Sequence, residues 1–208
     1  MQAPGGKVPP PVEGNMKKKS RACRTILGDW AENTGSQVAE LAIALPLLMI
    51  IVVGITDFGS AFNLKQILNS AVREGGRFAS NQTMADVTNQ TPNSIAAIRD
   101  VIDNYLTAAN LGDCGLATAV PNKSGPLIWT YTATSGCTGN GTLTLIIDRG
   151  TTLTTTAKNP VTIELTHIYI SYPFEWRFGK LMSLIVPNTS YALGVTPITA
   201  DAIMPNLD

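Results

Sequence analysis

The chain has 208 residues, of which only 14% are charged, and its formal net charge at pH 7 is zero. This balance excludes the strongly basic surface by which many proteins bind nucleic acid, so no nucleic-acid partner is expected. The charges are unevenly distributed: residues 1–35 carry six Lys or Arg against three acids, and the remainder carries nine bases against twelve acids. The two parts therefore suit different surroundings.

An apolar run follows the basic segment. Residues 41–56 contain no charged side chain, and residues 36–56 form a stretch of 21 residues. At a rise of about 1.5 Å per residue, a helix of this length spans roughly the 30 Å of bilayer hydrocarbon. We predict a transmembrane helix over 36–56. Because Lys and Arg lie on its N-terminal side, the positive-inside rule predicts a single pass with a cytoplasmic N-terminus.

Glu40 lies near the start of this run. A carboxylate at the edge of the hydrocarbon costs about 2 kcal/mol or more unless it has a partner, whereas one at headgroup depth is solvated, and the sequence does not fix the depth. A cut between Gly35 and Ser36 would give Ser36 a positive amino terminus, which could pair with Glu40 of a neighbouring subunit. Gly35 has no Cβ and would let a protease approach the backbone.

Pro46 lies inside the predicted helix. It has no N–H, so the carbonyl of Ala42 loses its helical partner and the helix can bend or loosen at this point. Since proline is common in transmembrane helices, a neutral kink and a role in assembly both stay open.

The segment that begins at Gly35 combines this glycine, an acid at the fifth position of the cut chain (Glu40), a proline in the helix (Pro46), and the sequences GITDFGSAFN and AVREGGRFA. With these features it resembles the TadE-like pseudopilins, minor subunits of the tight-adherence (Flp, type IVc) pilus. It departs from the family at Leu41, where an aromatic residue is often found. The resemblance covers about 45 residues; the rest of the chain matches only in general layout.

The resemblance implies a structural protein of pilus biogenesis, assembly and adhesion, and no enzyme. It implies that a prepilin peptidase removes residues 1–35 and that Glu40 and Pro46 serve assembly. The expected partners are the bilayer, other Tad/Flp pilus subunits and the inner-membrane assembly platform. The expected location is the bacterial inner membrane, with the C-terminal part periplasmic or in the pilus.

Two other interpretations of the N-terminal segment stay open. One is a conventional secretion signal cut after Ala61, although such signals usually have apolar regions of about 7 to 15 residues. The other is an uncut anchor that displays an extracytoplasmic binding domain, which would not need Glu40. We expect residues 1–35 to be a disordered leader, and both Met1 and Met16 are possible starts.

The rest of the chain predicts an α+β fold. Apolar residues at helical spacing predict a stalk helix over 57–80, with a break or a close contact at Gly75 and Gly76. We expect residues 81–208 to form a small extracytoplasmic head with an antiparallel sheet and one or two helices. Capping and turn signals predict a helix that begins near Thr91 and stops at Gly112. Alternating patterns predict extended segments at 127–133, 142–148, 161–172 and 191–204, with a short helix near 175–185.

Cys114 and Cys137 both lie in the predicted head, with 22 residues between them, whereas Cys23 lies in the leader. In an oxidising periplasm this pair predicts a disulfide worth about 3 kcal/mol. Two free buried thiols are the alternative.

No catalytic motif is found in the sequence. His167 is the only histidine, and it lies in strand register without a nucleophile or a pair of acids nearby. Paired ligand spacing for a metal is also lacking. We therefore expect no catalytic residues, no metal site and no cofactor.

Overall fold

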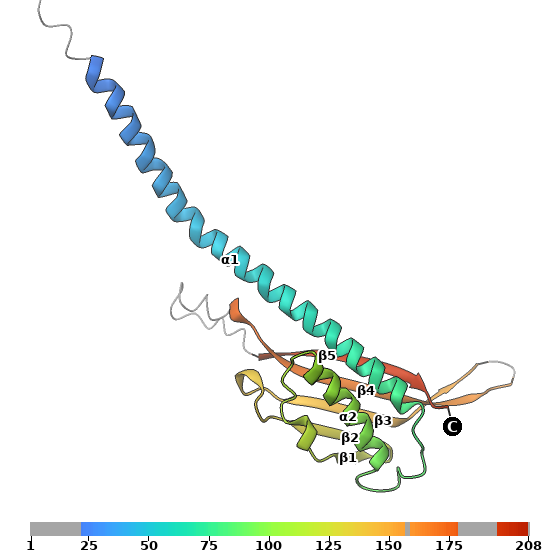
Figure 1. Cartoon of the computed structure of the whole chain (residues 1–208). Helices are drawn as coiled ribbons and strands as arrows, with labels where there is room; N and C mark the ends of the chain where they lie inside the picture. The colour runs from blue at the N-terminus through green and yellow to red at the C-terminus, as the bar shows by residue number, and fades with distance from the viewer. Residues whose placement is uncertain (1–21, 157–158, 179–194, 208) are drawn as a thin grey trace, which may run out of the picture. The chain divides into compact units, whose positions relative to one another are not determined.

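The structure is a computed structural model that describes residues 22–156, 159–178 and 195–207 (Figure 1). The chain divides into two compact units, residues 1–49 and 50–208. Helix α1 (Ala22–Ala79) is continuous and contributes to both.

Helix α1 begins earlier than the sequence suggested. Residues 22–35, which we expected to belong to a disordered leader, are helical. Residues 22–34 contain no proline, and an established helix extends without paying the cost of nucleation again. Residues 1–21 lie outside the described part of the chain.

The second unit contains a five-stranded antiparallel sheet in which each strand pairs with its neighbours in chain order. The strands are β1 (Asn122–Gly125), β2 (Ile128–Ala133), β3 (Leu143–Thr154), β4 (Thr162–Glu175) and β5 (Val195–Pro205). Two short 3-10 helices, η1 (Leu116–Thr118) and η2 (Thr138–Asn140), lie in its loops. The predicted α+β class, with a long apolar N-terminal helix and a small antiparallel sheet, is confirmed.

One face of the sheet carries the core. Alternate residues of β2, β3 and β4 are fully or almost fully buried, among them Trp129, Tyr131, Leu145, Ile147, Ile168 and Ile170. Helix α2 (Asn93–Ala108) buries Ile95, Ile98, Ile102 and Leu106 in the same core. The last turns of α1 add Leu64, Leu68, Ala71 and Val72. Figure 1 shows α2 lying over the sheet.

Helix α2 begins slightly later than predicted. Its N-cap is Pro92, not Thr91, and no side chain of the cap bonds the helix. Asp86 supplies this bond from the preceding loop: its Oδ2 accepts from the backbone N–H of Ser94 at 2.8 Å, and its Oδ1 accepts from Ser94 Oγ at 2.6 Å. A carboxylate at a helix N-terminus satisfies free N–H groups and suits the helix dipole.

At Gly75 and Gly76, helix α1 is unbroken and makes a close contact with its neighbours. A Cβ at Gly75 would lie 2.7 Å from Ile102 Cγ1, and one at Gly76 would lie 2.9 Å from Met204 Cγ. The absence of side chains therefore allows α1 to approach both α2 and β5 closely.

Candidate functional site

Gly35 and Ser36 lie on an exposed part of α1. A Cβ built on Gly35 meets no atom within 4 Å, so packing within the chain does not require a glycine there. The peptide between the two residues is helical, and a protease that binds its substrate in extended form would have to unwind this turn. Glycine lowers the cost, since it is about 1 kcal/mol less favourable in a helix than alanine.

Glu40 is exposed on the same helix. Among the described residues, no hydrogen-bond donor or cationic side chain is recorded at bonding distance from its carboxylate. A lone carboxylate at the start of an apolar helix is unfavourable in hydrocarbon. Any partner that compensates this charge in the membrane must come from solvent, lipid or another chain.

Pro46 lies inside α1, and the helix continues through it. The side chains around it are exposed and apolar, including Ile43, Leu47 and Met49. Residues 35–79 contain the one segment, among those described, that is long and apolar enough to cross a membrane. The described residues thus contain a single apolar helix, near the N-terminus, that is suited to membrane anchoring.

Asp57 is a residue whose role the sequence did not reveal. It is only 2% exposed, although it follows directly after the apolar run. Its Oδ2 accepts a hydrogen bond from the backbone N–H of Phe178 at 2.6 Å, across 121 residues of sequence. The carboxylate thereby ties the segment that follows β4 to the start of the predicted stalk. In the sequence, Asp57 stands out only as a charge at the boundary of the apolar run. This position identifies the residue but not its partner.

The sequence of this helix matches a known family model. Residues 35–77 match the TadE family model, described as TadE-like protein. The resemblance seen in the sequence is confirmed for this TadE-like segment, which contains Gly35, Ser36, Glu40 and Pro46. It relates the chain to the pilus-related membrane proteins of the Tad system. No significant match was found among curated proteins or among solved structures.

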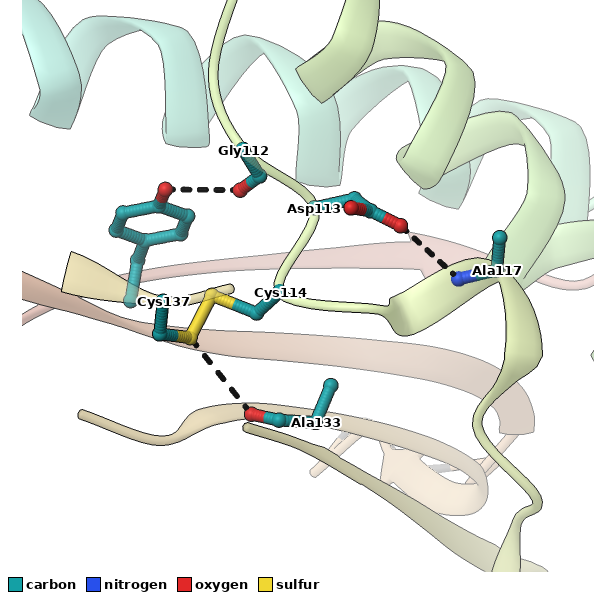
Figure 2. Close-up of a disulfide and its surroundings, with 7 residues drawn as sticks. Gly112, Asp113, Cys114, Ala117, Ala133 and Cys137 are labelled. Carbon is teal, nitrogen blue, oxygen red and sulfur yellow. Dashed lines mark hydrogen bonds between the residues drawn. A yellow bond between two sulfur atoms is a disulfide. The ribbon is translucent and has the colours of Figure 1, made fainter. Parts of the chain in front are cut away.

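The head contains the two cysteines of the predicted disulfide. The structure joins Cys114 and Cys137 with their Cα atoms 4.7 Å apart, inside the range that disulfides require (Figure 2). Cys114 precedes η1 and Cys137 precedes η2, so the bridge links two loops at one end of the sheet. Beside it, the hydroxyl of Tyr172 on β4 donates to Gly112 O at 2.8 Å. Whether the bridge forms in the cell stays a prediction.

Polar groups elsewhere in the described residues do not assemble into a metal site, since no three His, Cys, Asp or Glu side chains are placed to share an ion. His167 Nε2 lies 3.6 Å from Asp201 Oδ2 on the neighbouring strand.

A hollow of about 430 Å³ is lined by Asp57, Asn63, Tyr172, Trp176 and Arg177 among others. Its described lining contains no histidine or cysteine.

Proposed function

We propose that the protein is a minor pilin or pseudopilin of the tight-adherence (Flp, type IVc) pilus. A prepilin peptidase cuts it between Gly35 and Ser36, and Glu40 then serves its assembly with other pilus subunits. The observation that carries this proposal is Glu40: within the TadE-like segment it is an exposed carboxylate with no recorded partner in the described part of its own chain.

Cleavage and assembly are linked by charge. The cut would create an amino terminus at Ser36, four residues before Glu40 on the same helix. That terminus carries a positive charge at neutral pH, since an α-amino group has a pKa near 8. Pairing it with Glu40 of a neighbouring subunit would offset the cost of holding either charge at the hydrocarbon edge.

The same proposal assigns the topology. The N-terminus lies in the cytoplasm, α1 crosses the bacterial inner membrane, and the head lies in the periplasm or in the pilus. The head is the part that meets other pilus components and contributes to adhesion. The peptidase, the pilus subunits and the inner-membrane assembly platform are the proposed partners.

The mature N-terminus tests the processing step. Intact mass of the protein purified from its native membrane should correspond to residues 36–208. A start at Phe62 would indicate a secreted domain, and an uncut chain would indicate an ordinary membrane anchor. Either result would overturn the proposed processing.

Gly35→Val should leave the leader attached, because a branched side chain would obstruct the peptidase at the scissile bond. Gly59→Val is the matched control: it makes the same change on the same helix, where a Cβ also meets no atom within 4 Å. Normal maturation of both variants would count against the cut site.

Glu40→Gln removes the charge and keeps the shape of the side chain. We expect normal cleavage and a loss of surface pili, measured by shearing and immunoblotting. Glu74→Gln makes the same substitution at an exposed position further along α1 and should leave piliation unchanged. If the Glu40→Gln strain assembles normal pili, the role in assembly is wrong.

A further inference from the structure

An exposed apolar stripe continues past the end of the predicted transmembrane segment. Ile51, Ile55, Phe58 and Phe62 are 54%, 67%, 60% and 68% exposed, and their spacing of four, three and four residues places them on one face of α1. Phe58 and Phe62 lie beyond Asp57, where the uncharged run ends. The apolar face of the helix therefore extends about one and a half turns further than the uncharged run.

Trp176 and Phe178, which follow the end of β4, join this stripe. The rings of Phe58 and Trp176 meet edge to face, with centroids 5.5 Å apart, and Trp176 makes a similar contact with Phe174 at 5.0 Å. The buried carboxylate of Asp57 holds the backbone of Phe178 beside the helix. Phe58, Phe62, Trp176 and Phe178 thus form an aromatic patch on the second unit.

The polar atom of Trp176 is already satisfied within the chain, since its Nε1 donates to Thr196 Oγ1. Its ring therefore remains free to contact an apolar environment without leaving an unpaired N–H. Beside it, Arg177 is exposed. An aromatic ring next to a cation is typical of residues at the membrane interface, where the ring meets acyl chains and the cation meets phosphate.

A hollow of about 290 Å³ opens within the patch. It is lined by Gly54, Asp57, Phe58, Trp176 and Phe178, and its exposed wall consists of apolar atoms. Gly54 belongs to the uncharged run of α1, so the hollow begins at the depth of the bilayer edge. An apolar occupant suits this wall, since a polar group placed against it would lose its hydrogen bonds to water.

We propose that the aromatic patch lies in the outer interfacial layer of the bilayer and that the hollow receives a lipid acyl chain. The continuity of the patch with the exposed apolar face of the membrane segment identifies lipid as its occupant. The head is thereby held on the membrane surface by the residues that follow β4 as well as by its covalent link to α1. This inference rests on α1 crossing the bilayer and does not depend on cleavage at Gly35 or on Glu40.

Tryptophan fluorescence in lipid nanodiscs tests the proposal on the full chain. The protein has three tryptophans; Trp30→Phe leaves Trp176 and the fully buried Trp129, which serves as an internal reference. One copy per disc is reconstituted in lipids that carry bromine on the upper part of the acyl chains. Bromine quenches only on near contact, so we expect loss of most of the Trp176 emission and retention of the Trp129 emission.

The matched control is Trp176→Phe in the same background, which should show no quenching by the brominated lipid. If the emission of the Trp30→Phe protein is equally unaffected, the proposal is wrong. Quenching by acrylamide but not by bromolipid would place Trp176 in water and overturn it. Trp176 could also be shielded from both quenchers only when several copies share a disc. That result would assign the patch to contact with a second copy of the chain and would overturn the proposal.

Protease protection of residues 36–56 in the same discs checks the membrane span separately. If these residues are digested, the span and the lipid contact both fail. If they are protected and Trp176 is not quenched, only the lipid contact fails. Neither readout involves leader cleavage or pilus formation, so the pilus role is judged independently.

Discussion

The guanidinium Nη2 of Arg149 donates a hydrogen bond to the backbone carbonyl of Ala79, 70 residues earlier in the chain, at 3.2 Å. The same side chain donates to Gln82 O at 2.8 Å and to Thr83 O at 3.1 Å. Ala79 is the last residue of α1, and its carbonyl also accepts from the backbone N–H of Gln82 at 3.0 Å. Carbonyls at a helix C-terminus carry the negative end of the helix dipole. Arg149 is fully buried, so β3 supplies an internal cap for α1.

Arg149→Met should lower the free energy of unfolding by about 2–4 kcal/mol, since it removes three hydrogen bonds donated by a fully buried cation. Arg149→Lys should lose less, because it keeps a charge but cannot reach all three carbonyls with one planar group. Urea unfolding of the full chain in mild detergent, followed by near-UV circular dichroism, measures the difference. Arg77→Met is the control at an exposed position; equal losses for Arg77→Met and Arg149→Met would contradict the capping role.

A second prediction concerns pH. Burial raises the pKa of Asp103 above its ordinary value of 3.8, and the negative charge of Asp113 raises it further. Its buried Oδ1 accepts no hydrogen bond from the described residues. Because the folded state holds this proton more tightly than the unfolded state, the stability that the proton contributes is present below pH 3.8 and is lost as pH rises through the folded pKa.

Asp103→Asn keeps the shape of the side chain and removes this titration. We expect the variant to lose less stability than the parent protein between acid and neutral pH, and to be the more stable of the two at pH 7. Thermal unfolding across a pH series measures this. Parallel pH profiles for the two proteins would exclude a contribution from Asp103.

Asp86 provides a control of opposite sign. Partial burial opposes ionisation of Asp86, but its hydrogen bonds from Ser94 outweigh this effect and lower its pKa below 3.8. The stability contributed by the Asp86 carboxylate is therefore present above pH 3.8 and lost as pH falls through the lower folded pKa. Asp86→Ala should destabilise the protein by about 1 kcal/mol at pH 7 and by less in acid.

The elements of this fold were predictable where one local pattern dominates. The apolar run predicted a helix long enough to cross a bilayer, and α1 contains such a segment. Two-residue alternation located all of β2, half of β3 and most of β4. Strand β1 was not predicted, because its sequence, NKSG, has low strand propensity and is extended only through pairing with β2. The predicted helix near 175–185 lies mostly outside the described residues, and β4 itself continues to Glu175.

Contacts between distant residues were not predictable. The sequence identified Asp57 as a charge at the edge of the apolar run, but its partner is a backbone N–H 121 residues away. Arg149 looks like an ordinary strand residue until the fold brings it to the end of α1. For Gly75, the sequence left a break and a close contact open, and only the position of Ile102 decides between them.

That close contact yields a third prediction. Gly75→Ala should destabilise the protein by about 1–3 kcal/mol through overpacking against Ile102, less the gain of about 1 kcal/mol in helix propensity. Gly76→Ala should cost less, because the flexible Met204 side chain can move aside. Denaturation midpoints of the full chain in detergent measure both. A gain in stability for Gly75→Ala would show that α1 and α2 can separate without cost.

The last prediction concerns the bridge between Cys114 and Cys137. If it forms in the cell, mass spectrometry after alkylation without reductant should find only Cys23 modified, unless the leader has been removed. Cys137→Ser should then lower the free energy of unfolding by about 3 kcal/mol, the loop-closure value for a separation of 23 residues.

Adding a reductant should destabilise the parent protein by a similar amount and leave the Cys137→Ser variant unchanged. The Cys23→Ser variant should behave like the parent. If reductant does not alter the unfolding of the parent protein, the two cysteines are free thiols, and the loops before η1 and η2 are held by packing and by the hydrogen bond from Tyr172 to Gly112.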